Sequence, residues 1–118
     1  MVTPSRSPEM LLLTTRAIIA AQVGINVEKI SSASRLEEDL RISGDDLVEL
    51  VDVLFEKLSI APGDFSYLRH GNAEGFGLFG GITDALFGRV AAERIPLRVS
   101  MFVSAAIAGR WNYSELLD

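Results

Sequence analysis

A chain of 118 residues, 48% of them hydrophobic, is long enough for one domain with one apolar core. The absence of cysteine excludes disulfides and thiolate zinc sites, and a single histidine leaves little imidazole chemistry, so neither a metal site nor catalysis is expected. A formal net charge of -5 disfavours nucleic acid as a partner, because binding phosphate requires clustered Lys and Arg. A protein partner with a basic surface patch is favoured instead.

Residues 1–7 include a proline and two serines, so they are predicted to form a flexible tail before a single domain over residues 8–118. The apolar run that follows is interrupted by Arg16 and is shorter than a bilayer core requires. We therefore expect neither a signal peptide nor a membrane helix. The expected location is cytoplasmic, without membrane contact.

A first helix is predicted over residues 8–23. Ser7 is placed to cap its N-terminus, Pro8 suits the first helical position, and Gly24 is placed to end it in a left-handed conformation. Residues 24–43 show no sustained period, which predicts a long loop. Single apolar residues are expected to anchor this loop to the core: Ile25, Val27, Ile30, Leu36 and Leu40.

A second helix is predicted to begin at the segment Ser43-Gly44-Asp45-Asp46 and to end near Leu58. Ser43 is expected at the N-cap, where its hydroxyl would accept a hydrogen bond from a backbone N–H near Asp46. The helix has an apolar face at helical spacing, which should point to the core: Leu47, Leu50, Val51, Leu54 and Leu58.

The opposite face of this helix carries an acidic stripe, formed by Asp45, Glu49, Asp52 and Glu56. Like charges four residues apart destabilise a helix by a few tenths of a kcal/mol, so a purely solvated face would more readily mix signs. Val48 lies beside the stripe and could add an apolar contact. Two interpretations remain open here, a binding face for a basic protein partner and an ordinary charged surface.

Prolines and glycines mark turns from Ser59 to Gly81, with one short helical turn over residues 64–68. A short helix is predicted over residues 82–93, and a last helix is predicted from Pro96 to the cap residue Gly109. His70 lies next to Gly71 and is expected in an exposed turn. Trp111 could anchor an interface or fold back onto the core.

The glycine-rich segment 71–81 contains a literal GxGxxG pattern, but no strand precedes it, so nucleotide binding is not favoured. Phe76, Leu78 and Phe79 lie between its glycines. They are expected to cover the core opening between helices, while contact with a membrane or an apolar ligand is the alternative.

The segment from Ser34 to Leu58, SRLEEDLRISGDDLVELVDVLFEKL, resembles the loop and recognition helix of acyl carrier proteins. The resemblance extends from about Met10 to Ile60. The family's Asp-Ser-Leu signature, whose serine carries phosphopantetheine, aligns with Ser43-Gly44-Asp45, so Gly44 takes the place of the modified serine. Ser43 is the nearest hydroxyl, displaced by about 100° around the helix and about 1.5 Å along it.

A second resemblance runs over nearly the whole chain. The motifs Glu38-Asp39-Leu40-Arg41-Ile42-Ser43-Gly44-Asp45-Asp46, a Phe-Ser-x-Leu turn, a Leu-Phe-Gly stretch and a closing Pro-Leu-x-Val before Ala-Gly-Arg-Trp stand in this order. They look like a family of small bacterial proteins of unknown function grouped with acyl carrier proteins. In that family too, glycine tends to replace the serine.

The expected fold is therefore all-α, a small bundle similar to acyl carrier proteins, with a long loop after the first helix and a glycine-rich insertion before the last ones. The expected function is a non-enzymatic binding or regulatory module without a cofactor. Its partner-binding residues would be Asp45, Val48, Glu49, Asp52 and Glu56. The alternative is a working acyl or peptidyl carrier, with 4'-phosphopantetheine attached to Ser43, in lipid or natural-product synthesis.

Overall fold

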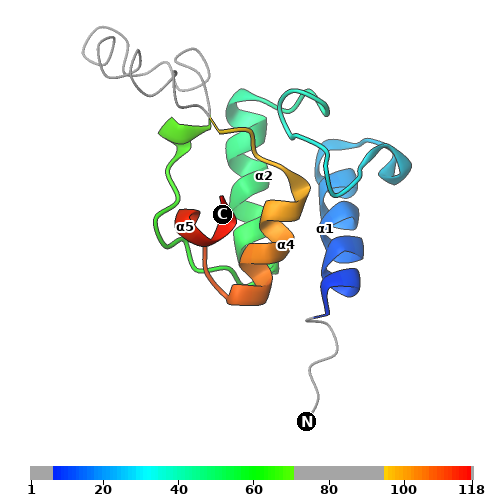
Figure 1. Cartoon of the computed structure of the whole chain (residues 1–118). Coiled ribbons are helices and arrows are strands. Elements are labelled where there is room, and N and C mark those ends of the chain that lie inside the picture. The colour runs from blue at the N-terminus through cyan, green and yellow to red at the C-terminus, as the bar shows by residue number, and fades with distance from the viewer. Residues whose placement is uncertain (1–6, 71–94, 118) are drawn as a thin grey trace, which may run out of the picture.

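Three helices pack around one apolar core in the computed structural model, which describes residues 7–70 and 95–117 (Figure 1). They are α1 (Pro8–Val23), α2 (Gly44–Lys57) and α4 (Val99–Ala108). Three single-turn elements complete the described part of the chain: η2 (Val27–Lys29), η3 (Tyr67–Arg69) and α5 (Tyr113–Leu116). Within these residues no strand forms beyond two isolated bridges, so the prediction of a small all-α bundle is confirmed.

Helix α1 begins and ends at the predicted residues. The Ser7 hydroxyl accepts a hydrogen bond from the Met10 N–H at 3.2 Å, and Gly24 adopts φ 74° while its N–H reaches the Ala20 carbonyl. Ser7, the last residue of the predicted tail, is thus the N-cap, and residues 1–6 lie outside the described part. No helix among the described residues is long and apolar enough to cross a bilayer.

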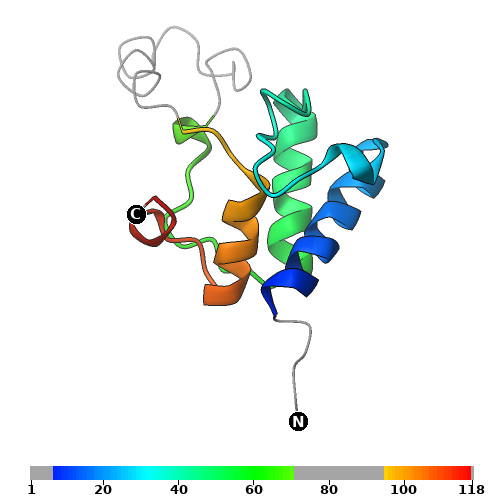
Figure 2. The same ribbon diagram turned by 45° about the vertical axis from the view of Figure 1, so that its right-hand side comes forward.

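Helix α1 lies beside both α2 and α4, with its N-terminal end next to the C-terminal end of α4 (Figure 2). Leu11, Thr15 and Ile19 form its buried face. The Thr15 hydroxyl donates to the Leu11 carbonyl at 2.7 Å, which satisfies a buried polar group inside the helix. The chain therefore places a polar side chain in its core at little cost.

The long loop between α1 and α2 is held by hydrogen bonds to α1 and to the segment before α4. Arg16 of α1 donates to the carbonyl oxygens of Ile30 and Val27, and Leu36 N–H donates to the Leu97 carbonyl at 2.8 Å. Ile30 and Leu36 are buried, as predicted for loop anchors, and Ile25 and Leu40 pack partly buried against the core. Val27 is 39% exposed, so its predicted anchoring role is wrong.

Helix α4 begins three residues later than predicted, at Val99 instead of Pro96. The residues before it are extended and form an antiparallel bridge between Arg98 and Arg35. This pairing with the loop uses backbone groups that would otherwise form hydrogen bonds within a longer helix. The predicted end at Gly109 is confirmed, with φ 83°.

Trp111 is fully buried and folds back onto the core, which settles the two interpretations offered by the sequence. Its ring centroid lies 5.1 Å from that of Phe102, 5.2 Å from that of Phe65 and 5.7 Å from that of Phe55. A Cβ at Gly63, which has φ 56°, would overlap the Trp111 carbonyl oxygen. The tryptophan thus joins the segment after α2 to the segment after α4.

Candidate functional site

The acidic stripe lies on the face of α2 that points away from the core. Asp45, Glu49, Asp52 and Glu56 are all exposed. At about 100° per residue, the four acids fall within about 60° of arc, centred about 180° from the buried leucines and valine of the same helix. The structure therefore brings together the acids predicted from the sequence and directs them to solvent.

The stripe is strongly negative because α2 carries five acids and one lysine. None of the ion pairs formed within residues 7–70 and 95–117 involves Asp45, Glu49 or Glu56. Their charges are available to a partner, and they repel one another along the helix. A basic group approaching this face would relieve that repulsion.

Asp52 differs from the other acids of the stripe because it has a partner within the chain. The Tyr67 hydroxyl donates to Asp52 Oδ1 at 3.2 Å and lies 3.4 Å from the Val48 carbonyl. Partial burial, together with the negative charge of Asp52, raises the pKa of Tyr67 above its usual range, so this donor keeps its proton. Val48 itself is partly buried beside the tyrosine.

The start of α2 differs from the prediction in one respect. Ser43 occupies the N-cap position, but its side chain makes no capping hydrogen bond, so the predicted contact near Asp46 is wrong. The reason is local: Gly44 follows with φ 60°, a left-handed conformation that departs from the usual entry into a helix. The exposed Ser43 hydroxyl is left unused by the helix.

The conformation of Gly44 also limits what could replace it. A Cβ at Gly44 would meet nothing within 4 Å, so space is not the constraint. The constraint is the positive φ, since an L-residue in the left-handed region costs about 1–2 kcal/mol. A serine at this position would have to accept that strain or shift the backbone at the start of α2.

One acid of the preceding loop is used locally. The Asp39 carboxylate accepts hydrogen bonds from the Arg35 backbone N–H at 2.9 Å and from its guanidinium at 2.9 and 3.0 Å. These bonds, and the charge of Arg35, lower the pKa of Asp39 to about 2. Asp39 therefore stabilises its own loop, and its charge is largely offset by Arg35.

His70 is buried, with 3% of its surface exposed, so its predicted position in an exposed turn is wrong. Its Nδ1 lies 2.8 Å from the Ile95 carbonyl oxygen, and its Nε2 lies 2.6 Å from the Tyr113 hydroxyl. Since a carbonyl only accepts, Nδ1 carries the proton and Nε2 accepts from Tyr113. Burial is the main cause that lowers the pKa of His70 to about 4.

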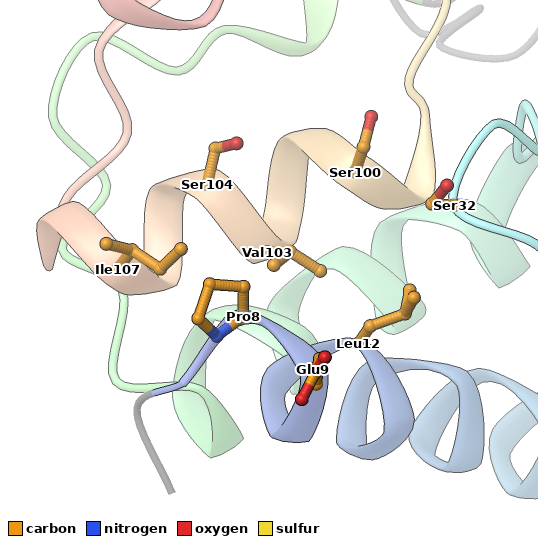
Figure 3. Close-up of a pocket in the computed structure, with 8 residues that line it drawn as sticks. All are labelled: Pro8, Glu9, Leu12, Ser32, Ser100, Val103, Ser104 and Ile107. Atoms are coloured by element: carbon orange, nitrogen blue, oxygen red, sulfur yellow. The ribbon is translucent and has the colours of Figure 1, made fainter.

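A cleft of about 290 Å³ lies between the N-terminal half of α1 and α4. Figure 3 shows Val103 of α4 pointing toward Pro8 and Leu12 of α1, with Ile107 at the end of the cleft. Glu9 is its one titratable lining residue. This lining offers apolar contact and no acid-base pair.

Two further hollows lie between α1 and α2 and share Gln22. The larger, of about 410 Å³, is lined by apolar and small residues of α1 together with Val53 and Lys57. The smaller, of about 190 Å³, is lined by Gln22, Val23, Asp46 and Glu49. In the described part of the chain, no three His, Asp or Glu residues gather to hold a metal ion.

These features define a small all-helical domain whose second helix presents unpaired carboxylates to solvent. A family model described as "Protein of unknown function (DUF1493)" matches residues 13–114, and the chain belongs to this family. This agrees with the resemblance to small proteins of unknown function that the motif order indicates. No curated protein and no solved structure matches the chain.

Other predicted features have mixed outcomes. The glycine-rich segment with Phe76, Leu78 and Phe79, and the predicted helix over residues 82–93, lie outside the described residues. Sequence reasoning missed α5. Asn112 followed three residues later by Glu115 is a capping signal, and the Asn112 side chain does accept from the Ser114 N–H at 2.9 Å. Sequence reasoning also missed the two hollows between α1 and α2.

Proposed function

We propose that the protein is a non-enzymatic binding or regulatory module that presents the acidic face of α2 to a basic patch on a protein partner. The observation that carries the proposal is the position of Asp45, Glu49 and Glu56, which are exposed, without ion pairs among the described residues, and opposite the buried face. Such a field steers a partner of opposite charge and contributes to specificity. The cytoplasm is the proposed compartment.

The resemblance of residues 34–58 to acyl carrier proteins supports this role, because that family uses its second helix to bind basic patches on enzymes. The same comparison argues against a phosphopantetheine arm. Gly44, which takes the place of the modified serine, has no side chain and adopts a left-handed conformation. We propose that binding through the acidic helix operates here without the prosthetic group.

A second candidate is a carrier modified at Ser43. One observation favours it: the Ser43 side chain is exposed and is not engaged in capping α2. A hydroxyl that the fold does not use is open to modification. Its displacement by one residue from the expected position, with the left-handed Gly44 between it and the helix, is the argument against recognition by a transferase.

Charge reversal of the acidic face is expected to abolish partner binding. The double variant Asp45→Lys/Glu56→Lys changes two exposed acids without touching the buried face or the Asp52 to Tyr67 contact, so the fold should be retained. Affinity purification of parent and variant from a cell extract, at low and at high salt, measures the effect. Partners recovered with the parent should be lost with the variant and should weaken with salt.

The matched control is Glu9→Lys/Glu28→Lys, which makes the same change in net charge at two exposed acids away from α2. This control should recover the same partners as the parent. Equal recovery by the parent and the α2 variant would show that the acidic face is only a solvated surface. Equal loss from the two double variants would show that net charge, and not the α2 face, governs binding.

Coexpression with a promiscuous phosphopantetheinyl transferase is expected to leave the intact mass unchanged. The reason is the displacement of the Ser43 hydroxyl from the position that such an enzyme reads. Mass spectrometry of parent and Ser43→Ala proteins gives the answer. A gain of one phosphopantetheine in the parent that is absent from Ser43→Ala would establish the carrier function instead.

A further inference from the structure

The outer face of α1 is unusual for a surface helix because it is apolar. Met10 is 46% exposed and Leu13 is 55% exposed. Two alanines on the same side, Ala17 and Ala21, are exposed as well. Surface helices normally carry charged residues on their solvent-facing side, so this exposed apolar face of α1 is a candidate contact surface for a partner.

Free charge is nearly absent from α1. Its two ionisable residues are Glu9, at the first turn, and Arg16. Arg16 is committed to the chain itself, since its guanidinium donates to the Ile30 carbonyl at 2.6 Å and to the Val27 carbonyl at 2.9 Å. Arg16 is thus the one charged residue from Met10 to Gln22, and its guanidinium binds the loop after α1 instead of pointing to the apolar face.

This apolar face adjoins a groove with charge at its ends. The two hollows between α1 and α2 meet at Gln22 and together make the α1/α2 groove. Its middle is lined by Ala17, Ile18, Ala21 and Val53, its acidic end by Asp46 and Glu49, and Lys57 lies at the other end. Small residues in the middle let another helix approach closely, as ridges-into-grooves packing requires.

The charges argue against a second copy of this chain as the occupant. In a two-fold pairing through α1, antiparallel helices would bring Glu9 and Lys57 of one copy toward the C-terminal end of α1 in the other, and each copy carries a formal net charge of -5. That end lies beside Asp46 and Glu49, as the lining of the smaller hollow shows. One lysine opposes these acids while two negatively charged chains repel each other, so a partner with a more basic end is the complementary occupant.

We propose that the α1/α2 groove docks an apolar α-helix with a basic end, supplied by a partner protein. Apolar side chains of this helix pack between Ala17, Ile18 and Val53, while its basic end lies against Asp46 and Glu49. The inference rests on the proposed function for the sign of the partner's charge. It adds the shape of the partner, which the acidic face alone does not define.

Synthetic helical peptides of about 18 residues, comparable to α1 in length, test the proposal by fluorescence anisotropy. The first peptide has a leucine face and arginines at one end. The second replaces the arginines with glutamates, and the third keeps the arginines but replaces the leucines with glutamines. The first should bind about tenfold more tightly than either of the others.

The protein variant Ala17→Gln fills the middle of the groove without changing charge, and a melting curve checks that it folds. It should weaken binding of the first peptide about tenfold. The control Ala108→Gln alters an exposed alanine at the end of α4 and should leave the affinity unchanged. NMR shifts on adding the first peptide should map to α1 and α2.

The outcomes separate the two proposals. Equal binding of the first and third peptides, or an unchanged affinity in Ala17→Gln, would overturn the groove while leaving the acidic face as a binding site. Failure of every peptide to bind at millimolar concentration would also overturn it. A concentration-dependent dimer that Ala17→Gln abolishes would identify a second copy as the occupant. Loss of the acidic-face function is seen separately, in the charge-reversal experiment.

Discussion

Replacing Trp111 with alanine is expected to lower the free energy of unfolding by about 3–5 kcal/mol, the range measured for large aromatic residues in protein cores. The indole is fully buried and lies against the rings of Phe55, Phe65 and Phe102. Since a domain has only about 5–15 kcal/mol of stability in total, the variant should lose a large share of it and unfold at a much lower urea concentration than the parent. Urea unfolding followed by far-ultraviolet circular dichroism measures the change.

The variant Trp111→Phe provides the matched comparison. It keeps an aromatic ring and removes an indole N–H that is buried without a hydrogen-bond partner among the described residues. Its cost should therefore be well below that of alanine, because an aromatic ring stays in the core and only part of the side-chain volume is removed. An alanine variant within about 1 kcal/mol of the parent would contradict the central role of this side chain.

Acidification is expected to destabilise the protein through His70. Burial lowers the pKa of His70 to about 4 in the folded state, whereas the unfolded chain has a value near 6.5. The unfolded state therefore binds a proton first as the pH falls. The stability that the neutral ring provides is complete above about pH 6.5, declines as the pH falls, and is lost near pH 4, a total of about 3 kcal/mol.

Burial has the largest effect on the pKa of His70, and the neighbouring groups have smaller effects. Arg69 lowers the pKa, while the hydrogen bond to the Ile95 carbonyl raises it. Arg69 also stacks on Tyr113, with its guanidinium carbon 4.6 Å from the ring centroid, so a cation already occupies this neighbourhood. Glu37 and Glu38 line a small hollow that also contains His70, and their charge acts in the opposite sense.

Two measurements check this prediction. The pH dependence of unfolding between pH 7 and pH 5 should be steeper in the parent than in His70→Gln, where no ring titrates and carboxylates contribute equally to both. NMR of the His70 ring in the folded protein should show no midpoint above pH 5. A ring that titrates near pH 6.5 would contradict the burial of the histidine in solution.

The sequence predicted the features that depend on neighbouring residues. Helix α1 has its predicted bounds because Ser7, Pro8 and Gly24 act on the backbone within a few residues of themselves. The acidic stripe of α2 follows in the same way from helical spacing alone. Both could be derived without knowing what packs against them.

The predictions that failed depend on distant parts of the chain. His70 has a glycine as its neighbour, which indicated a turn, but its ring meets Ile95 and Tyr113, 25 and 43 residues away in the sequence. The start of α4 was misplaced because residues 97 and 98 pair with residues 35 and 36. No local pattern records such contacts, because they are set by how the helices assemble.

The candidate groove shows a related limit. Ala17, Ile18 and Val53 are unremarkable in the sequence, and apolar residues on a helix are normally assigned to the core. Their importance arises only once α1 and α2 are packed and one apolar side of α1 is left exposed. A surface of this kind is a property of the assembled pair of helices and not of either one.

The contact between residues 69–70 and Ile95 has a consequence for how this chain can vary. Ile95 N–H donates to the Arg69 carbonyl at 2.7 Å, and the His70 ring holds the Ile95 carbonyl. The described segment that ends at His70 and the one that begins at Ile95 therefore meet at this contact. Closing a loop between joined ends depends only weakly on its length. This position can gain or lose chain without disturbing the helices, and it is where relatives of different length should diverge.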